Sequence, residues 1–405
     1  MYLFTSEVVS PGHPDKCADI IADSIVDKAI QLDKNSRVAS EVFVAGKNII
    51  IGGEIKTTAD MSNEVYHQIV RDALTNIGYG TDNYFNYKEA LHTNDINIQV
   101  LINQQSPDIS QGVDQSTGEI GAGDQGIMFG YANSETDNYM PSAISYARVL
   151  MERVYDFALN NPDKLGVDIK TQVTVDYGSK ENFENCLPQK IDTIVVSAPS
   201  VTSMEINEVR KLIKSLIDSA GLDASLYNPD ECTIHINPTG KYTNHSSLHD
   251  AGLTGRKLIV DSFGGYAPIG GGAQSSKDYT KVDRSGLYAA RWLSKHIVAS
   301  GLAKKATVQL SYAIGIAKPL SVSVNTEGTA LIKGVNDVVL SDFIIEHYPL
   351  TPKWITDKFN LDKPSIDNFL YADVAARGQV GQEDYPWEQL DELERFEALK
   401  GASNV

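Results

Sequence analysis

The residues best suited to chemistry lie between Gly270 and Ser285, where three successive glycines precede two lysines and an aspartate. Glycines have no Cβ, so a ligand can approach their backbone N–H groups. Lys277 and Lys281 are four residues apart and on a helix would share one face, while Asp283 is suited to holding a metal ion. This combination predicts a polyphosphate–magnesium site, but a flexible loop with solvated charges fits the same composition.

The charge around this stretch is opposite to that of the whole chain. The 405 residues include 35 Lys and Arg against 53 Asp and Glu, a formal net charge of −18. Between Gly255 and Arg284, five basic residues face three acidic ones. A positive pocket in a negative protein favours a small, highly charged anion as the ligand and argues against a long nucleic acid.

The overall composition predicts a globular protein of two or three domains. Hydrophobic residues make up 42% of the chain, enough for packed cores, and a prior of about 150 residues per domain gives the domain number. No apolar run approaches the roughly 18 residues of a membrane helix, and the N-terminus does not resemble a signal peptide. The three cysteines are odd in number and far apart, which predicts reduced thiols in a cytoplasmic protein.

His13 and Asp15 precede a segment with helical periodicity. Apolar residues recur every three or four positions from Ala18 to Ala29, which predicts an amphipathic helix over residues 15–31. The two polar residues would lie at its N-terminus, where free N–H groups and the helix dipole favour anions. Taken singly, Asp15 is also explained as a helix-start carboxylate and His13 as a loop histidine.

A β-hairpin is predicted next, with strands over Val38–Ala45 and Asn48–Lys56 and a two-residue turn between them. In that register Glu41 and Glu54 lie on the same face, on a diagonal of roughly 7 Å. The face is partly apolar, and carboxylates there are costly unless each has a cationic partner. The pair is therefore explained either by ligand binding or by an ion pair at an interface.

The remaining periodicity predicts an α+β architecture, because helices are separated by hairpins and not by single strands. Further helices are predicted over residues 62–77, 140–159, 204–219 and 282–298. Further strands are predicted over residues 95–102, 169–177, 190–197, 231–236, 258–262, 305–314 and 320–326. Residues 105–115 are polar and aperiodic, which indicates a lid or a disordered excursion. The acidic segment after Pro386 is predicted to be helical and peripheral.

Two further patterns are weaker. Gly121–Gly126 matches the spacing Gly-x-Gly-x-x-Gly, but no strand precedes it and residues 131–138 indicate a polar turn where a helix should follow. A glycine loop that presents Asp124 is favoured over a dinucleotide site. His245 and His249 are four residues apart but lack the glutamate and third ligand of a zinc site.

Several motifs, in order along almost the whole chain, resemble those of the S-adenosylmethionine synthetase (methionine adenosyltransferase) family. The motifs are Gly-His-Pro-Asp-Lys (12–16), Gly-Gly-Glu-Ile (52–55), Gln-Ser-Pro-Asp-Ile (105–109), Gly-Ala-Gly-Asp-Gln-Gly (121–126), Ile-Asn-Pro-Thr-Gly (236–240), Gly-Leu-Thr-Gly-Arg-Lys (252–257) and Lys-Val-Asp-Arg-Ser (281–285). The resemblance extends from Phe4 to about Trp387, and the set is far more specific than any one motif. A Walker-type phosphate loop is absent, because Ser276 precedes Lys277 and Asp278 follows it.

The resemblance implies three similar α+β domains with interleaved contacts. The domains that we expect from it on this chain are an N-terminal domain at 1–103, a mobile lid at 104–118, a central domain at 119–236, a C-terminal domain at 237–386 and an acidic tail at 387–405. It also implies a cytoplasmic homodimer or homotetramer with active sites at the subunit interface, and no nucleic-acid or membrane partner.

The implied reaction joins L-methionine to ATP. The methionine sulfur attacks the 5′ carbon of ATP and expels triphosphate, which is then hydrolysed to pyrophosphate and phosphate. A thioether sulfur is already a nucleophile and needs no base. The obstacle is the charge of the leaving group, so catalysis should depend on positioning and electrostatic stabilisation. An ATP-dependent phosphotransferase and a non-catalytic nucleotide sensor are the alternatives.

The resemblance assigns roles residue by residue. The catalytic residues that it implies are His13, Lys170, Arg256, Lys277 and Lys281. The implied ATP contacts are His13, Asp124, Asp168, Lys170, Lys241, Tyr242, Asp250, Arg256, Lys257, Ala273, Lys277 and Lys281. The implied methionine contacts are Glu54, Gln105, Asp250 and Lys277. Asp15 and Asp283 resemble ligands for two Mg²⁺ ions, and Glu41 resembles the ligand for K⁺.

Four features depart from the family pattern. Gln274 and Ser276 stand where many relatives have phenylalanine and glycine, which changes packing and backbone freedom beside Lys277. Residues 244–249 replace a glycine-rich segment, and Gln115 takes a lid position that is often basic. These departures bear on turnover rate, nucleotide fit and lid closure more than on the type of reaction.

Overall fold

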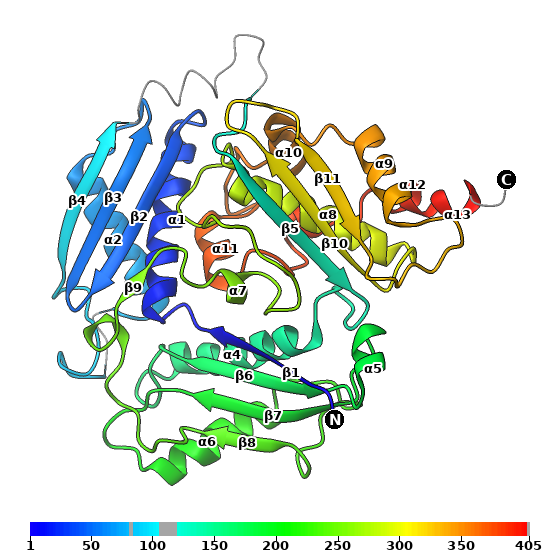
Figure 1. The fold of residues 1–405 in the computed structure, drawn as a ribbon. Helices are drawn as coiled ribbons and strands as arrows, with labels where there is room; N and C mark the ends of the chain where they lie inside the picture. Colours follow the sequence, from blue (N-terminus) through cyan, green and yellow to red (C-terminus); the bar gives the residue numbers. More distant parts are fainter. Residues whose placement is uncertain (81–83, 105–119, 403–405) are drawn as a thin grey trace.

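Three β-sheets pack around a set of helices in the part of the chain that is described (Figure 1). The computed structural model describes residues 1–80, 84–104 and 120–402. Gln105, Gln115 and all but the first residue of the predicted lid therefore lie outside the described residues.

Each sheet contains one strand from a distant part of the chain. The first sheet has the order β4 (Asn97–Gln104), β3 (Asn48–Lys56), β2 (Arg37–Ala45) and β9 (Gly252–Leu253). The second has the order β1 (Leu3–Val9), β6 (Lys170–Asp176), β7 (Lys190–Ser197) and β8 (Thr233–Ile236). The third has the order β11 (Ser321–Asn325), β10 (Lys305–Tyr312) and β5 (Gly126–Asn133). The predicted α+β class is confirmed. The strands β9, β1 and β5, each paired with a strand far away in the sequence and called the exchanged strands below, account for the interleaved contacts.

Helices cover these sheets and bring them together. They are α1 (Pro14–Leu32), α2 (Asn63–Ile77), α4 (Ser142–Asn160), α5 (Lys180–Glu184), α6 (Ile206–Asp218), α7 (Leu258–Asp261), α8 (Val282–Ala299), α9 (Asp337–His347), α10 (Pro352–Phe359), α11 (Tyr371–Arg377), α12 (Leu393–Glu397) and α13 (Leu399–Ala402), with short 3-10 helices at Ser246–Leu248 and Pro386–Glu388. α1 packs against β2, α2 and α11, whereas α8 packs against β5 and β10. Every residue from Val282 to Val298 is buried, so α8 is a core helix.

The hairpin has the predicted register. Ala45 pairs with Asn48, and Glu41 pairs with Gly52. Because side chains alternate along a strand, Glu41 and Glu54 lie on the same face of the first sheet. The predicted face is thus confirmed.

Two predicted elements are wrong. Residues 258–262, predicted as a strand, contain helix α7, where Arg148 donates hydrogen bonds of 3.1 Å each to the carbonyls of Val260 and Ser262. These bonds satisfy the backbone without a neighbouring strand. The predicted polar turn at 131–138 is also partly wrong, because residues 131–133 complete β5. That strand pairs with β10, which lies far away in the sequence.

Two further expectations fail for Lys277, Lys281 and the C-terminal segment. The two lysines do not share a helix face, because both precede α8: Lys277 forms an isolated bridge with Ala39, and Lys281 is the N-cap residue of α8. The segment after Pro386 is helical in part, as predicted; it is not peripheral at Trp387, Glu388 and Phe396, which are buried, but most of its other residues up to Gly401 are exposed or half-buried. Trp387 is fully buried, and its ring stacks on a core tyrosine, Tyr288, with the centroids 3.7 Å apart.

Candidate active site

His13 lies at the N-terminus of α1 and is almost completely buried. Its Nδ1 accepts a hydrogen bond of 3.1 Å from the backbone N–H of Asp15, so the neutral ring has its proton on Nε2. Burial lowers the pKa of His13 to about 3, with help from the positive charges of Lys257 and Lys170. The imidazole is therefore an uncharged hydrogen-bond donor near pH 7, with two cations nearby.

Asp15 connects this helix to the segment that contains Arg256 and Lys257. Its carboxylate accepts hydrogen bonds from Lys257 Nζ and from the backbone N–H of Leu253, the latter at 3.0 Å, and lies 3.5 Å from Arg256 Nε. Burial alone would raise the pKa of Asp15, but the hydrogen bonds from Lys257 and Leu253 outweigh it and hold the pKa below its usual value. Asp15 is thus an ionised carboxylate at the centre of a cationic group.

Asp168 extends the same group towards Lys170 and Tyr242. Its Oδ2 accepts hydrogen bonds from the Ser246 N–H at 3.1 Å and from the Tyr242 hydroxyl at 3.3 Å. Its Oδ1 is buried and has no hydrogen-bond partner among the described residues. Burial raises the pKa of Asp168 to about 6. A buried acceptor of this kind is costly unless a ligand supplies the donor, and a hydroxyl group would fit.

The glycine-rich stretch forms a second group. Lys277 Nζ lies 2.6 Å from Asp283 Oδ2, and Lys281 donates to Asp278, a residue that sequence reasoning missed. A Cβ on Gly272 would lie only 2.2 Å from Asp283 Oδ2, so only glycine lets the backbone pack this closely against that buried carboxylate.

The two groups meet through close backbone approaches. A Cβ on Gly255, next to Arg256, would lie 2.6 Å from the Cβ of Ala273. A Cβ on Gly123 would lie 3.4 Å from Lys281 Cδ, which places the loop of Asp124 beside that lysine. Asp250 acts electrostatically on Asp168 and so belongs near the first group.

A cavity of about 340 Å³ connects the glycine-rich stretch to the first sheet. Its lining includes Glu41 and Phe43 of β2, Ile50 of β3, and Lys277. Glu54 is on the same sheet face, opposite Ala39, which forms the bridge with Lys277. The carboxylates predicted from the hairpin and the lysine predicted from the glycine-rich stretch therefore come together.

Lys241 is exposed, and its Nζ donates a hydrogen bond to the Thr202 carbonyl. Gln105 lies outside the described residues.

The donor set fits Mg²⁺. Among the described residues, no group of three or more His, Cys, Asp or Glu side chains is placed to hold a metal ion. Mg²⁺ often binds through one or two carboxylates together with substrate phosphates, and Asp15 and Asp283 offer such oxygens beside cationic side chains. Glu41 offers a carboxylate oxygen at the cavity that Lys277 also lines.

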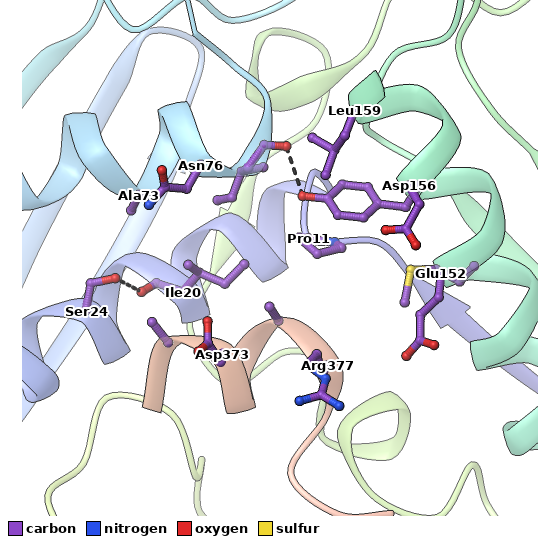
Figure 2. A pocket seen from close by; sticks show the side chains of 15 residues that line it. Pro11, Ile20, Ser24, Ala73, Asn76, Glu152, Asp156, Leu159, Asp373 and Arg377 are labelled. Atoms are coloured by element: carbon purple, nitrogen blue, oxygen red, sulfur yellow. Dashed lines mark hydrogen bonds between the residues drawn. The ribbon is translucent and has the colours of Figure 1, made fainter. Parts of the chain in front are cut away.

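A larger cavity, of about 450 Å³, lies elsewhere (Figure 2). It is lined by residues of α1, α2, α4 and α11, among them Ile20, Tyr155 and Asp373. The predicted site residues do not line it. Its lining combines apolar side chains with three carboxylates (Glu152, Asp156 and Asp373) and one arginine, Arg377, and this net negative charge does not suit a polyphosphate.

The fold and this site define an α+β protein with a polyanion pocket built from several segments. Three family models match it: the N-terminal domain of S-adenosylmethionine synthetase at residues 1–107, the central domain at 119–242 and the C-terminal domain at 245–389. The chain belongs to the S-adenosylmethionine synthetase family.

Individual relatives match along nearly the whole chain. The S-adenosylmethionine synthase of Staphylococcus epidermidis is 42% identical, with 96% of each chain covered. That of Sulfurovum is also 42% identical, with 99% of each covered. A solved structure described as an unusual S-adenosylmethionine synthetase from Campylobacter jejuni is 64% identical, has a TM-score of 0.94 and covers 99% of this chain and 100% of its own.

Proposed function

We propose that this protein is a methionine adenosyltransferase, which forms S-adenosylmethionine from L-methionine and ATP. The observation that carries the proposal is the pairing of Lys257 with Asp15 and of Lys277 with Asp283. Each pair puts an ammonium group that can neutralise phosphate beside a carboxylate that would hold Mg²⁺, and the departure of triphosphate needs such positive charge. The names of the relatives support the same reaction.

The reaction needs little from the protein at the nucleophile. The methionine sulfur attacks the 5′ carbon of ATP, the bond from that carbon to oxygen breaks, and triphosphate leaves with both bonding electrons. Hydrolysis of the triphosphate then gives pyrophosphate and phosphate. The protein's task is to hold the phosphates and to stabilise the charge that develops on the leaving oxygen.

Roles for the side chains follow from the charges in the site. The neutral His13 donates from Nε2, while Lys170, Arg256, Lys257, Lys277 and Lys281 neutralise phosphate oxygens. Asp168 accepts from a substrate hydroxyl, and Asp124, Lys241, Tyr242, Asp250 and Ala273 complete the nucleotide site. Glu54, Asp250 and Lys277 bind methionine, together with Gln105. Asp15 and Asp283 would hold two Mg²⁺ ions and Glu41 a K⁺ ion; when bound, these cations neutralise further negative charge.

A homodimer or homotetramer with its active sites at the subunit interface is part of the proposal. Support comes from the outer face of the first sheet, where Phe43 is 38% and Leu101 59% exposed beside Glu41. Exposed apolar side chains around predicted site residues favour a second copy of the chain as their cover.

The proposed location is the cytoplasm. All three cysteines are free thiols, which supports a reducing compartment. In the described part of the chain, no helix has the length and apolar character needed to cross a membrane.

The test is product identification by mass spectrometry. The protein is incubated with ATP, methionine, Mg²⁺ and K⁺, and we expect S-adenosylmethionine, pyrophosphate and phosphate. ADP or AMP alone would instead indicate a phosphotransferase. ATP binding without methionine-dependent turnover would indicate a nucleotide sensor.

A further inference from the structure

Helix α1 has four aspartates at intervals of four residues: Asp15, Asp19, Asp23 and Asp27. This spacing places them along one side of the helix. All four are buried, the most exposed at 6%. Buried carboxylates are costly unless their oxygens are hydrogen-bonded, so each must have a specific partner. The partners distinguish their roles.

Asp19 binds the backbone immediately before a predicted phosphate-binding pair. Its Oδ1 accepts a hydrogen bond of 2.8 Å from the N–H of Gly255, the residue that precedes Arg256 and Lys257. Its Oδ2 lies 3.4 Å from Lys16 Nζ, which is also bound to Asp261 at 2.6 Å. Lys16 would thus keep a carboxylate partner if Asp19 were replaced.

Asp23, one helical turn later, also binds the backbone beside a predicted phosphate-binding residue. Its Oδ1 accepts a hydrogen bond of 2.8 Å from the N–H of Ser276, the residue before Lys277. Both of its oxygens also accept from Arg284 Nη2 at 2.6 Å, and Arg284 follows Asp283. Asp23 therefore binds two neighbours of predicted site residues: the backbone of Ser276, beside Lys277, and the side chain of Arg284, beside Asp283.

Asp27 has the same chemistry in another place. Its two oxygens accept the backbone N–H groups of Tyr371 and Ala372, at 2.9 Å each. These residues begin α11, which contains none of the predicted site residues. Asp27 is the comparison on the same helix: it binds no backbone next to a predicted phosphate-binding residue, although the Tyr371 ring packs on Arg284 with its centroid 4.4 Å away.

We propose that Asp19 and Asp23 are positioning residues: α1 holds the backbones of Gly255 and Ser276 so that Arg256, Lys257 and Lys277 point at the triphosphate. The inference rests on the proposed function. Hydrogen bonds to a carboxylate are stronger than those between neutral groups, and a helix is a rigid base for them. With the backbone fixed, the cations need only choose a side-chain rotamer, and a misplacement of about 1 Å can cost about 100-fold in rate.

The first experiment compares Asp23→Asn with Asp27→Asn. In Asp23→Asn the amide NH2 faces Arg284 where Oδ2 accepts now, and the bond from the Ser276 N–H loses its charged acceptor. In Asp27→Asn one of the two backbone N–H groups loses its acceptor, so in either variant a backbone contact of α1 weakens. Both variants should therefore lose thermal stability. Only Asp23→Asn should lower kcat per folded molecule, by about 10- to 100-fold. Equal losses of kcat in the two variants, or no loss in either, would overturn the proposal.

The second experiment needs no turnover and avoids leaving Arg284 unpaired. Isothermal titration calorimetry measures the affinity of the full-length protein for inorganic tripolyphosphate with Mg²⁺, in the wild type, Asp19→Ala and Asp27→Ala. We expect Asp19→Ala to weaken binding at least about tenfold, the equivalent of one misplaced charge contact, and Asp27→Ala to match the wild type. If Asp19→Ala binds tripolyphosphate as tightly as the wild type, the positioning role is wrong and the proposed function is unaffected. A wild-type protein that neither binds tripolyphosphate nor forms S-adenosylmethionine overturns the proposed function and the inference with it.

Discussion

Among single residues, Lys277 has the sharpest predicted effect on the reaction. Its ammonium group lies beside Asp283 and opens onto the cavity with Glu41. If the charge of the leaving group is the obstacle, Lys277→Ala should lower kcat by an amount equivalent to roughly 2–4 kcal/mol, the scale of one lost oxyanion donor. Steady-state kinetics with varied ATP measures this.

The control for that measurement is Lys180→Ala. Lys180 is exposed and pairs only with Glu184 on its own short helix in the described ion pairs, so its loss should leave kcat unchanged. If Lys277→Ala raised KM for ATP and left kcat intact, Lys277 would bind the ground state without helping the transition state.

Ser276 has a backbone conformation that suits glycine better. Its φ is +82°, where an L-residue pays roughly 1–2 kcal/mol, whereas glycine is unstrained. Ser276→Gly should raise the free energy of unfolding by about 0.5–1 kcal/mol, the relief being partly offset by the greater freedom of glycine in the unfolded chain. The urea midpoint measures it. Ser275→Gly, at a neighbour without positive φ, should lower stability; a drop in Ser276→Gly as well would show that the hydroxyl matters more than the strain.

The buried His13 should make stability depend on pH. Its pKa is about 3 when folded and 6.5 when exposed, so between these values the unfolded chain binds a proton that the folded chain does not. His13 therefore makes the protein lose stability as the pH falls from 6.5 towards 3, with a slope of at most about 1.4 kcal/mol per pH unit. In His13→Asn, whose side chain can still accept the Asp15 N–H, this part of the slope should vanish.

Urea unfolding between pH 4 and 7 tests this dependence. His235→Asn, at an exposed histidine, is the comparison. Coincident slopes for the wild type and His13→Asn would contradict a buried, uncharged His13.

At the scale of elements, Gly130 determines how closely α8 packs on β5. A Cβ there would lie 2.0 Å from the carbonyl carbon of Ala290 and 2.2 Å from the backbone nitrogen of Arg291. Gly130→Ala should therefore push the helix away and lower the free energy of unfolding by about 1–3 kcal/mol, as overpacking does. At Gly401 in α13, a Cβ would meet no described atom within 4 Å, so Gly401→Ala should cost nothing. Equal stability of the two variants would mean that α8 can shift freely.

Elements with local signals were predictable from the sequence. α1 has an unbroken apolar period, and the two-residue turn between β2 and β3 determines the register that puts Glu41 opposite Gly52. The apolar run that begins at Leu258 was wrongly predicted as a strand. Its carbonyls are bound by Arg148, which lies more than a hundred residues earlier and cannot be identified as a partner from the local sequence. Lys277 and Lys281 lie beside Asp283 and Asp278 but precede α8, and the sequence did not show this because the N-terminus of α8 depends on tertiary contacts.

At the scale of the whole molecule, the pairing partners of the exchanged strands could not be predicted from the sequence. β1, β5 and β9 each pair with a strand more than a hundred residues away, and no local pattern indicates that partner. The burial of Trp387 and Glu388 is hidden in the same way, because the acidic composition around them indicates a solvated segment. The family resemblance anticipated the interleaving only in general terms.

The first sheet's outer face makes the assembly itself testable. In one row across the sheet, Glu41, Gly52 and Leu101 are adjacent, and in the next, Phe43 pairs with Ile50. If a second copy covers this face, Leu101→Glu places an unpaired charge in the interface, and the dissociation constant should rise at least about 100-fold, the equivalent of roughly 3 kcal/mol. Light scattering after size-exclusion chromatography measures the mass.

Ile366→Glu is the matched control, because Ile366 is 92% exposed in the segment between α10 and α11 and should be neutral. Activity should fall together with the fraction of oligomer, since the predicted potassium and methionine ligands Glu41 and Glu54 lie on the covered face. On dilution, Leu101→Glu should therefore lose specific activity at concentrations where the wild type and Ile366→Glu keep it. An oligomeric and fully active Leu101→Glu would place the interface elsewhere and leave each chain to complete its own site.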